Sequence, residues 1–218
     1  MTEKRTIASL WDEAVAQERR TPAYLVEEKD GAWREVSWAE AAQSVDELAH
    51  GLLALGVRKG DAFGILGRTR LEWSLFDFAL AHVGAVAAPI YPSSTPRECR
   101  HILEDSEAIG VLVESDEELR LIGDARGLPA LTHVFTFADL AQLRARGREH
   151  AAEHPDGVKE AAAEIADDDL FTFIYTSGTT GPPKGCMIRN SNYFEMARSA
   201  DLVQDFFRPT DVLLLYLP

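Results

Sequence analysis

One short segment of the sequence gathers residue types that could hold a phosphate. Tyr175 to Gly185 reads YTSGTTGPPKG, with four Ser or Thr side chains, three glycines and one lysine in eleven positions. Glycine tolerates positive φ and lets backbone N–H groups approach an anion closely. Hydroxyl groups donate to phosphate oxygens, and a lysine adds a mobile positive charge. The segment therefore predicts a phosphate-binding loop.

The spacing within this loop excludes two common nucleotide-binding motifs. A Walker A loop needs glycine before its lysine and Ser or Thr after it, whereas Pro183 and Gly185 flank Lys184. No GxGxxG pattern stands in the first strand–helix units, which argues against a dinucleotide-binding fold. A plain surface turn is the alternative that needs no ligand, but this order of residues directly after an apolar strand is rare.

A second pattern, at residues 150–154, resembles a metal-binding motif. His150-Ala-Ala-Glu-His154 fits the HxxEH zinc-protease signature, in which two histidines four residues apart share a metal from one helical face. Pro155 follows at once, and the neighbouring residues supply no apolar face to bury such a site. The favoured interpretation of residues 144–169 is a solvated helix and linker, with the zinc site as the alternative.

Charge and cysteine content restrict the partners and the compartment. The chain has 36 acidic and 22 basic residues and a formal net charge of −14, which repels nucleic acids and anionic membrane surfaces. The longest nearly apolar stretch, residues 75–90, is too short and too interrupted to span a bilayer. The N-terminus lacks the apolar stretch of a secretory signal, and Cys99 and Cys186 form no CxxC pair. We expect a cytoplasmic protein that binds small molecules, with no nucleic acid partner and no transmembrane segment.

Short apolar strands alternate with helices from residue 60 onward, and these elements must position the loop. The runs expected to be strands are AFGILG, AVAAPIY, IGVLVES, THVFTF, LFTFIYTSG and DVLLLYLP. Helices are expected between them, for example over residues 71–83 and from Pro96 to about Ser106. This alternation predicts an α/β fold, a mostly parallel sheet flanked by helices, with the loop at the carboxyl edge of the sheet.

The first 59 residues have a different pattern. We expect an amphipathic helix over residues 7–18 with Leu10 on its apolar face, and then a hairpin turned by Asp30-Gly31. Ser37, followed three residues later by glutamate, predicts the start of a helix that Gly56 stops.

YTSGTTGPPKG resembles the phosphate-loop signature of adenylate-forming enzymes, which include acyl-CoA synthetases, peptide-synthetase adenylation domains and luciferases. HVGAVAAPIYP and VSWAEAAQSVDELAHGLLALGVRKGDAFGIL resemble upstream segments of that family, in the expected order. The run GRTRLEWSLFDFALAHVGAVAAPIYPSSTPRECRHILEDSEA is most similar to bacterial long-chain fatty-acyl-CoA synthetases. The resemblance implies that residues 1–218 are part of the large N-terminal domain. Residues 1–59 would form its first helices and hairpin, and 60–218 its α/β core with the phosphate loop at 175–185.

Members of this family condense a carboxylate with ATP to an acyl-adenylate, release pyrophosphate, and pass the acyl group to a thiol such as CoA. The resemblance implies an acyl-CoA synthetase that uses ATP with Mg²⁺, a carboxylic acid and CoA. Residues of the loop would bind the β- and γ-phosphates: Thr176, Ser177, Gly178, Thr179, Thr180, Gly181, Lys184 and Gly185. No catalytic residue is expected within the chain, because the family's adenine and Mg²⁺ contacts, ribose-binding aspartate and catalytic lysine lie beyond Pro218.

The sequence also departs from the family pattern and leaves alternatives open. Asn190 stands where the family usually has a histidine, and Arg189 where it usually has a hydroxyl residue. An adenylation domain that loads a carrier protein, or a non-catalytic module that only binds nucleotide, are the alternative functions. DVLLLYLP is expected to be a core strand at the end of a fragment, which favours self-association through its unpaired edge.

Overall fold

The centre of the protein is a six-stranded sheet. The computed structural model describes residues 4–17, 21–123, 127–176, 182–201 and 211–215. Within them the strand order is β6-β5-β3-β4-β7-β8, and every neighbouring pair is parallel except β7 with β8. The strands are β3 (Ala62–Leu66), β4 (Val86–Ile90), β5 (Gly110–Val113), β6 (His133–Thr136), β7 (Leu170–Thr176) and β8 (Lys184–Arg189). The expected mostly parallel α/β sheet is confirmed.

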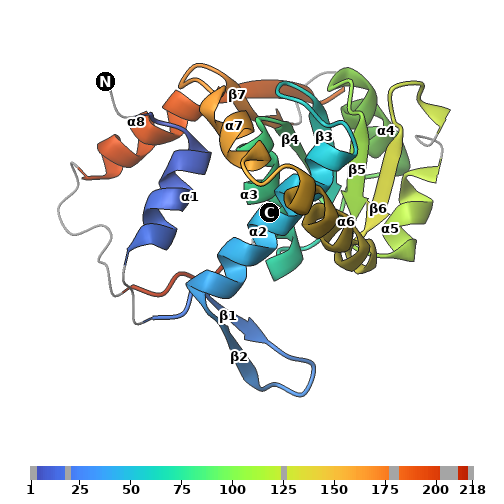
Figure 1. Ribbon diagram of the computed structural model, residues 1–218. Coiled ribbons are helices and arrows are strands. Elements are labelled where there is room, and N and C mark those ends of the chain that lie inside the picture. Colours follow the sequence, from blue (N-terminus) through green and yellow to red (C-terminus); the bar gives the residue numbers. More distant parts are fainter. Residues whose placement is uncertain (1–3, 18–20, 124–126, 177–181, 202–210, 216–218) are drawn as a thin grey trace.

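Right-handed crossovers explain which face of the sheet each helix covers. The chain passes from β3 to β4 through α3 (Leu71–Val83) and then turns back past β3 to β5 through α4 (Pro96–Asp105). Because these connections run in opposite directions along the sheet, their helices lie on opposite faces. α2 (Trp38–Ala54), α6 (Leu140–Glu153) and α7 (Gly157–Ala163) share the face of α3, and α5 (Asp116–Leu121) shares that of α4 (Figure 1).

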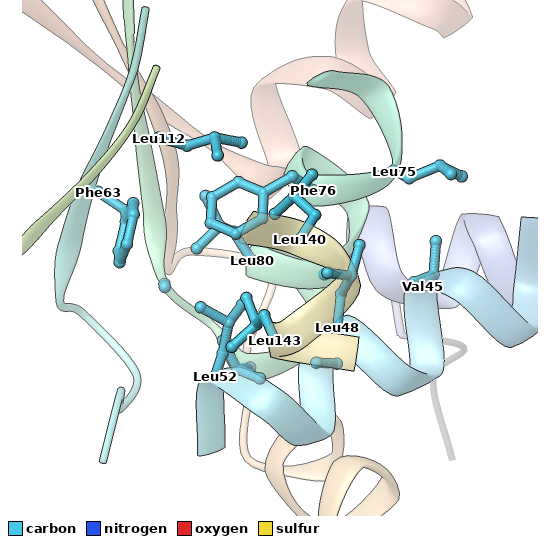
Figure 2. Close-up of a cluster of buried hydrophobic side chains, with 14 of the residues drawn as sticks. Val45, Leu48, Leu52, Phe63, Leu75, Phe76, Leu80, Leu112, Leu140 and Leu143 are labelled. Carbon is cyan, nitrogen blue, oxygen red and sulfur yellow. The ribbon is translucent and has the colours of Figure 1, made fainter. Parts of the chain in front are cut away.

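Apolar side chains fill the space between the sheet and the helices on both faces. Figure 2 shows the cluster on the α3 face, where the rings of Phe63 and Phe76 meet edge to face with centroids 5.3 Å apart. Leu66 points to the opposite face, where it joins Leu103 of α4. All five residues of β3 are buried, as expected for a parallel strand covered on both sides.

The N-terminal elements are confirmed apart from one helix face. They are α1 (Ile7–Ala16) and the antiparallel hairpin of β1 (Tyr24–Glu27) and β2 (Trp33–Val36). Gly31 in the hairpin turn has φ 82°, as the Asp-Gly signal predicts. Leu10 was predicted to face the core and is 48 % exposed, whereas Ala8 is buried. Adjacent helical residues lie about 100° apart, so Leu10 turns to the side once its neighbour Trp11 faces α3.

Both ends of α2 form as predicted. The Ser37 hydroxyl accepts a hydrogen bond from the backbone N–H of Glu40. At the other end Gly56 has φ 88° and donates to Leu53, while Val57 donates to Leu52. This pair of hydrogen bonds is a Schellman motif, which satisfies the last carbonyl groups of the helix.

Residues 144–169 pack more closely than a solvated linker would, which corrects that interpretation. α6 crosses α2 where Gly51 and Gly147 bring the two backbones together, and a Cβ on Gly147 would overlap the carbonyl of Glu47. The buried Glu47 carboxylate accepts hydrogen bonds from Arg144 at 2.7 Å and Arg148 at 2.9 Å. These arginines hold the pKa of Glu47 below its ordinary value, against the opposing effect of its burial.

The C-terminal part differs from expectation in two places. Residues 184–189, not predicted to be a strand, form β8, and α8 (Asn190–Asp201) follows close to its predicted start. Residues 211–215, predicted to begin a core strand, are irregular, and Val212 is 80 % exposed. An apolar run forms a strand only where a neighbour supplies its backbone hydrogen bonds, and none of the described strands pairs with it.

Candidate phosphate-binding site

The predicted phosphate loop is carried on a hairpin stem at the carboxyl end of β7. Thr176, the last residue of β7, lies opposite Lys184, the first of β8, and Tyr175 lies opposite Gly185. The five predicted residues between them, Ser177, Gly178, Thr179, Thr180 and Gly181, lie outside the described residues. The structure therefore brings together the residues at the two ends of the loop.

Lys184 and Thr176 are both available to a ligand. Both are exposed. Among the described residues, the ion pairs do not include Lys184. An ammonium group without a carboxylate partner can neutralise a bound anion, and a neighbouring hydroxyl can donate to it. The stem thus provides a positive charge and a donor at the sheet edge where ligands of open α/β folds bind.

Gly185 has a structural reason to be glycine. The ring of Tyr175 lies across it, so that a Cβ on Gly185 would stand 3.0 Å from Cζ of the tyrosine. The Tyr175 hydroxyl donates to Oδ2 of Asp105 at 2.8 Å, and burial raises the pKa of this tyrosine, with a further increase from the Asp105 contact. Gly185 therefore permits the packing of Tyr175, in addition to any contact with phosphate.

The residue directly before β8 is held by a histidine for which the sequence predicts no role. Nε2 of His101, on α4, lies 2.8 Å from the carbonyl oxygen of Pro183. The His101 ring also meets the Tyr175 ring at 84°, with centroids 6.3 Å apart. The signal for this role was the spacing of His101 and Asp105, four residues apart on one helix and therefore on one face.

A small cavity lies beside the stem, on the α3 face. It has a volume of about 160 Å³ and is lined by Trp73, Asp77, Pro89, Tyr91, Phe171, Thr172, Ile174, Tyr175 and Tyr193. Burial raises the pKa of Asp77 to about 7. Nε1 of Trp73 is buried and has no hydrogen-bond partner among the residues that the structure describes. The cavity therefore combines largely aromatic walls with one carboxyl group whose pKa lies near neutral pH.

Asn190, at the position where the family resemblance expects histidine, has a structural role. Its side chain is 4 % exposed. Its amide oxygen accepts from the backbone N–H of Ile7 at 2.9 Å, and its amide nitrogen donates to the carbonyl of Asp169 at 3.1 Å. Asn190 therefore joins the start of α8 to the start of α1 and to the residue before β7.

The His150–His154 pattern forms a different cluster from the one that a zinc site needs. The rings of His150 and His154 lie 4.8 Å apart, and Nδ1 of His150 lies 2.9 Å from Nδ1 of the buried His50. Burial lowers the pKa of His150, and the neighbouring histidines lower it further. Over the described ranges no three His, Cys, Asp or Glu residues are arranged to hold a metal ion. The zinc alternative gains no support, and the contact with His50 was not foreseen.

A family model described as AMP-binding enzyme matches residues 11–218 of the chain. The chain belongs to this family. Among curated relatives it is 37 % identical over 210 residues to the long-chain-fatty-acid–CoA ligase FadD15 of Mycobacterium bovis, covering 92 % of this chain and 34 % of the relative. It is 30 % identical over 210 residues to the peroxisomal long chain acyl-CoA synthetase 7 of Arabidopsis thaliana, covering 87 % and 29 %. The chain thus spans about a third of the length of these relatives.

Solved structures of this family share the fold. The inhibitor-bound N-terminal domain of FACL13 from Mycobacterium tuberculosis superimposes with a TM-score of 0.81 at 30 % identity, covering 99 % of this chain and 52 % of that one. The anthranilate CoA ligase AuaEII, solved with anthranoyl-AMP, gives 0.73 at 26 % identity, covering 91 % and 36 %. The resemblance inferred from the loop and its upstream segments is confirmed. Within the described residues, no helix has the length and apolar character needed to cross a membrane.

Proposed function

We propose that this chain is the N-terminal part of an AMP-forming acyl-CoA synthetase for long-chain fatty acids, and that the loop on the β7–β8 stem binds the triphosphate of ATP. In this reaction a carboxylate oxygen attacks the α-phosphorus and the bond to the β-phosphate breaks, so that pyrophosphate leaves. The thiol of CoA then attacks the acyl carbonyl and AMP leaves. The substrate class rests on the relatives, which are long-chain-fatty-acid–CoA ligases.

One observation carries the proposal for the loop. Lys184, which no carboxylate neutralises among the described residues, lies across the stem from Thr176, at the point where the glycine- and hydroxyl-rich segment begins and ends. A donor cluster of this kind acts by positioning the triphosphate and by stabilising the charge that develops on the leaving pyrophosphate. In this proposal the phosphate contacts come from Thr176, Ser177, Gly178, Thr179, Thr180, Gly181 and Lys184, with Gly185 shaping the stem.

Two further elements of the proposal concern Mg²⁺ and location. We propose that Mg²⁺ enters as the counter-ion of ATP, as the family resemblance implies, with the protein's own Mg²⁺ contacts in the part of the family fold that follows Pro218. We also propose a cytoplasmic location, supported by Cys99 and Cys186, which are both free thiols.

Binding of inorganic triphosphate to the 218-residue chain tests the proposal. We expect backbone NMR signals of Thr176, Lys184 and Gly185 to shift on titration with triphosphate. Lys184→Ala should weaken binding by about tenfold, the typical effect of losing a charge-assisted hydrogen bond. Lys29→Ala is the matched control, because Lys29 is an exposed lysine in the β1–β2 turn. Equal loss in both variants, or shifts spread over the whole surface, would refute a specific phosphate site.

A further inference from the structure

We propose that His101 is a positioning residue for the phosphate loop and that α4 fixes both strands of the loop's stem. His101 holds Pro183, directly before the strand that leaves the loop, and Asp105, one turn further along α4, holds Tyr175 on the strand that enters it. The consequence for ATP binding rests on the function proposed above, whereas the anchoring itself does not.

The hydrogen bond to Pro183 is specific in its direction. A carbonyl oxygen only accepts, so Nε2 of His101 must carry the hydrogen in the bond of 2.8 Å. Proline has no backbone N–H, and its carbonyl is therefore the single backbone group through which Pro183 can be held by a hydrogen bond. Lys184 follows directly in the chain, so the bond also fixes the backbone from which the lysine side chain starts.

The second contact makes the attachment two-sided. The Tyr175 hydroxyl donates to Asp105 at 2.8 Å, and the edge-to-face contact of Tyr175 with His101 links the two anchors. Residues four apart on a helix project from one face, so both contacts come from the same side of α4. The two stem residues are separated in the chain by the whole predicted loop, yet a single helix holds them both.

α4 is a suitable support because it is itself well fixed. Its start is closed by a capping box in which Thr95 and Glu98 satisfy each other's backbone N–H groups, with Pro96 at the first helical position. Cys99 and Leu103 bury its inner face against the sheet. A loop whose ends are already held loses less conformational entropy when it closes on a ligand, which strengthens binding without any new contact to that ligand.

Amide hydrogen exchange of the 218-residue chain tests the anchor independently of any ligand. We expect His101→Ala to reduce protection of residues 184–186 by three- to tenfold, which corresponds to one ordinary hydrogen bond, while β3 keeps its protection. His101→Gln, whose amide can donate from a position near Nε2, should restore most of the loss. His133→Ala is the matched control, a histidine on β6 at the opposite edge of the sheet. Unchanged protection at residues 184–186 in His101→Ala would overturn the anchor.

Titration of the same variants with inorganic triphosphate tests the positioning role. His101→Ala should weaken triphosphate binding by three- to tenfold, and His101→Gln should recover it. If protection falls but affinity does not change, His101 only stabilises the fold and the positioning role is wrong. If the unaltered chain shows no saturable binding of triphosphate, the proposed phosphate binding is wrong, and the positioning role is wrong with it. The hydrogen-exchange result still decides whether α4 holds the stem.

Discussion

At the scale of single residues, we expect Asp77 to make the stability of the fold depend on pH. Burial raises its pKa to about 7, from an ordinary value of about 3.9. Between these values the unfolded chain loses a proton that the folded chain keeps, so the free energy of unfolding decreases as the pH rises. Below this range the carboxyl is protonated in both states, and above it the loss is complete.

We expect Asp77→Asn to be more stable than the unaltered chain at pH 8 and similar to it near pH 4. The stability that the unaltered chain loses above pH 7 is about 1.4 kcal/mol for each unit of pKa difference between the folded and unfolded states. Urea unfolding at a series of pH values measures the free energy of unfolding of both proteins. Asp30→Asn, at an exposed position in the hairpin turn, should leave the pH profile unchanged. If Asp77→Asn does not change the dependence of stability on pH, the Asp77 carboxyl has the same pKa in the folded and the unfolded chain.

Individual residues were predictable from the sequence where their type alone carries the chemistry. The loop stood out because glycine, hydroxyl and lysine residues follow one another in the chain. The structure places Thr176 and Lys184 opposite each other at its stem, and their contact with phosphate stays a prediction. His101 and His50 were not recognised, because each acquires its role from a contact with a distant segment: Pro183 in one case and His150 in the other. No local pattern records such a contact.

At the scale of elements, the contact of α2 with α6 depends on glycine. A side chain on Gly147 would overlap the Glu47 carbonyl, which is backbone and cannot rotate away. We expect Gly147→Ala to lower the free energy of unfolding by about 1–3 kcal/mol, the usual cost of overpacking, in spite of alanine's better helix propensity. Thermal unfolding measures this change. Gly123→Ala serves for comparison, since a Cβ there would meet no atom within 4 Å, and an equally large effect at both glycines would contradict the explanation.

α2, α3, α4 and the inner strands were predictable because each carries its own signal. α3 begins and ends at the predicted residues, and the stop of α2 follows from Gly56. Two predictions were wrong for the same reason: β8 was not predicted to be a strand, and residues 211–215 were. KGCMIR is polar at both ends and becomes a strand because β7 pairs with it, whereas VLLL is strongly apolar and has no paired neighbour among the described strands.

At the scale of the whole molecule, the chain spans 34 % of the length of its Mycobacterium relatives. We expect it to catalyse no adenylate formation by itself, because the resemblance places the adenine contacts, the ribose-binding aspartate and the catalytic lysine outside it. Loss of one preorganised donor can cost about 3 kcal/mol of transition-state stabilisation, and here several are absent together. Carboxylate-dependent exchange of pyrophosphate into ATP measures this. Exchange at the rate of an intact ligase, assayed in parallel, would disprove it.

Exposed apolar surface should make the chain self-associate. Val212, Leu213, Leu214 and Leu215 are between 58 and 80 % exposed, and β8 is at the edge of the sheet formed by the described strands, with Met187 62 % exposed. Such surfaces favour pairing with a second chain. Sedimentation velocity should show mass increasing with concentration. The double variant Leu213→Lys, Leu215→Lys should reduce this increase in mass. The control variant Leu25→Lys, on the β1–β2 hairpin, should not reduce it. A chain that stays monomeric at every concentration would count against self-association.

The attachment of β7 to β4 also has a consequence for how the protein folds. The hydrogen bond from the Thr172 hydroxyl to the Ala87 carbonyl joins residues 85 positions apart, and among the described strands β8 pairs with β7 alone. Contacts this distant in the chain form slowly, because a long segment must be closed before any gain is made. The hairpin that carries the loop is therefore expected to join the sheet late, after β3, β4 and β5 have assembled. We therefore expect the hairpin, with the proposed phosphate-binding loop, to be the last part to mature and, once its two contacts with α4 are broken, the first to be lost.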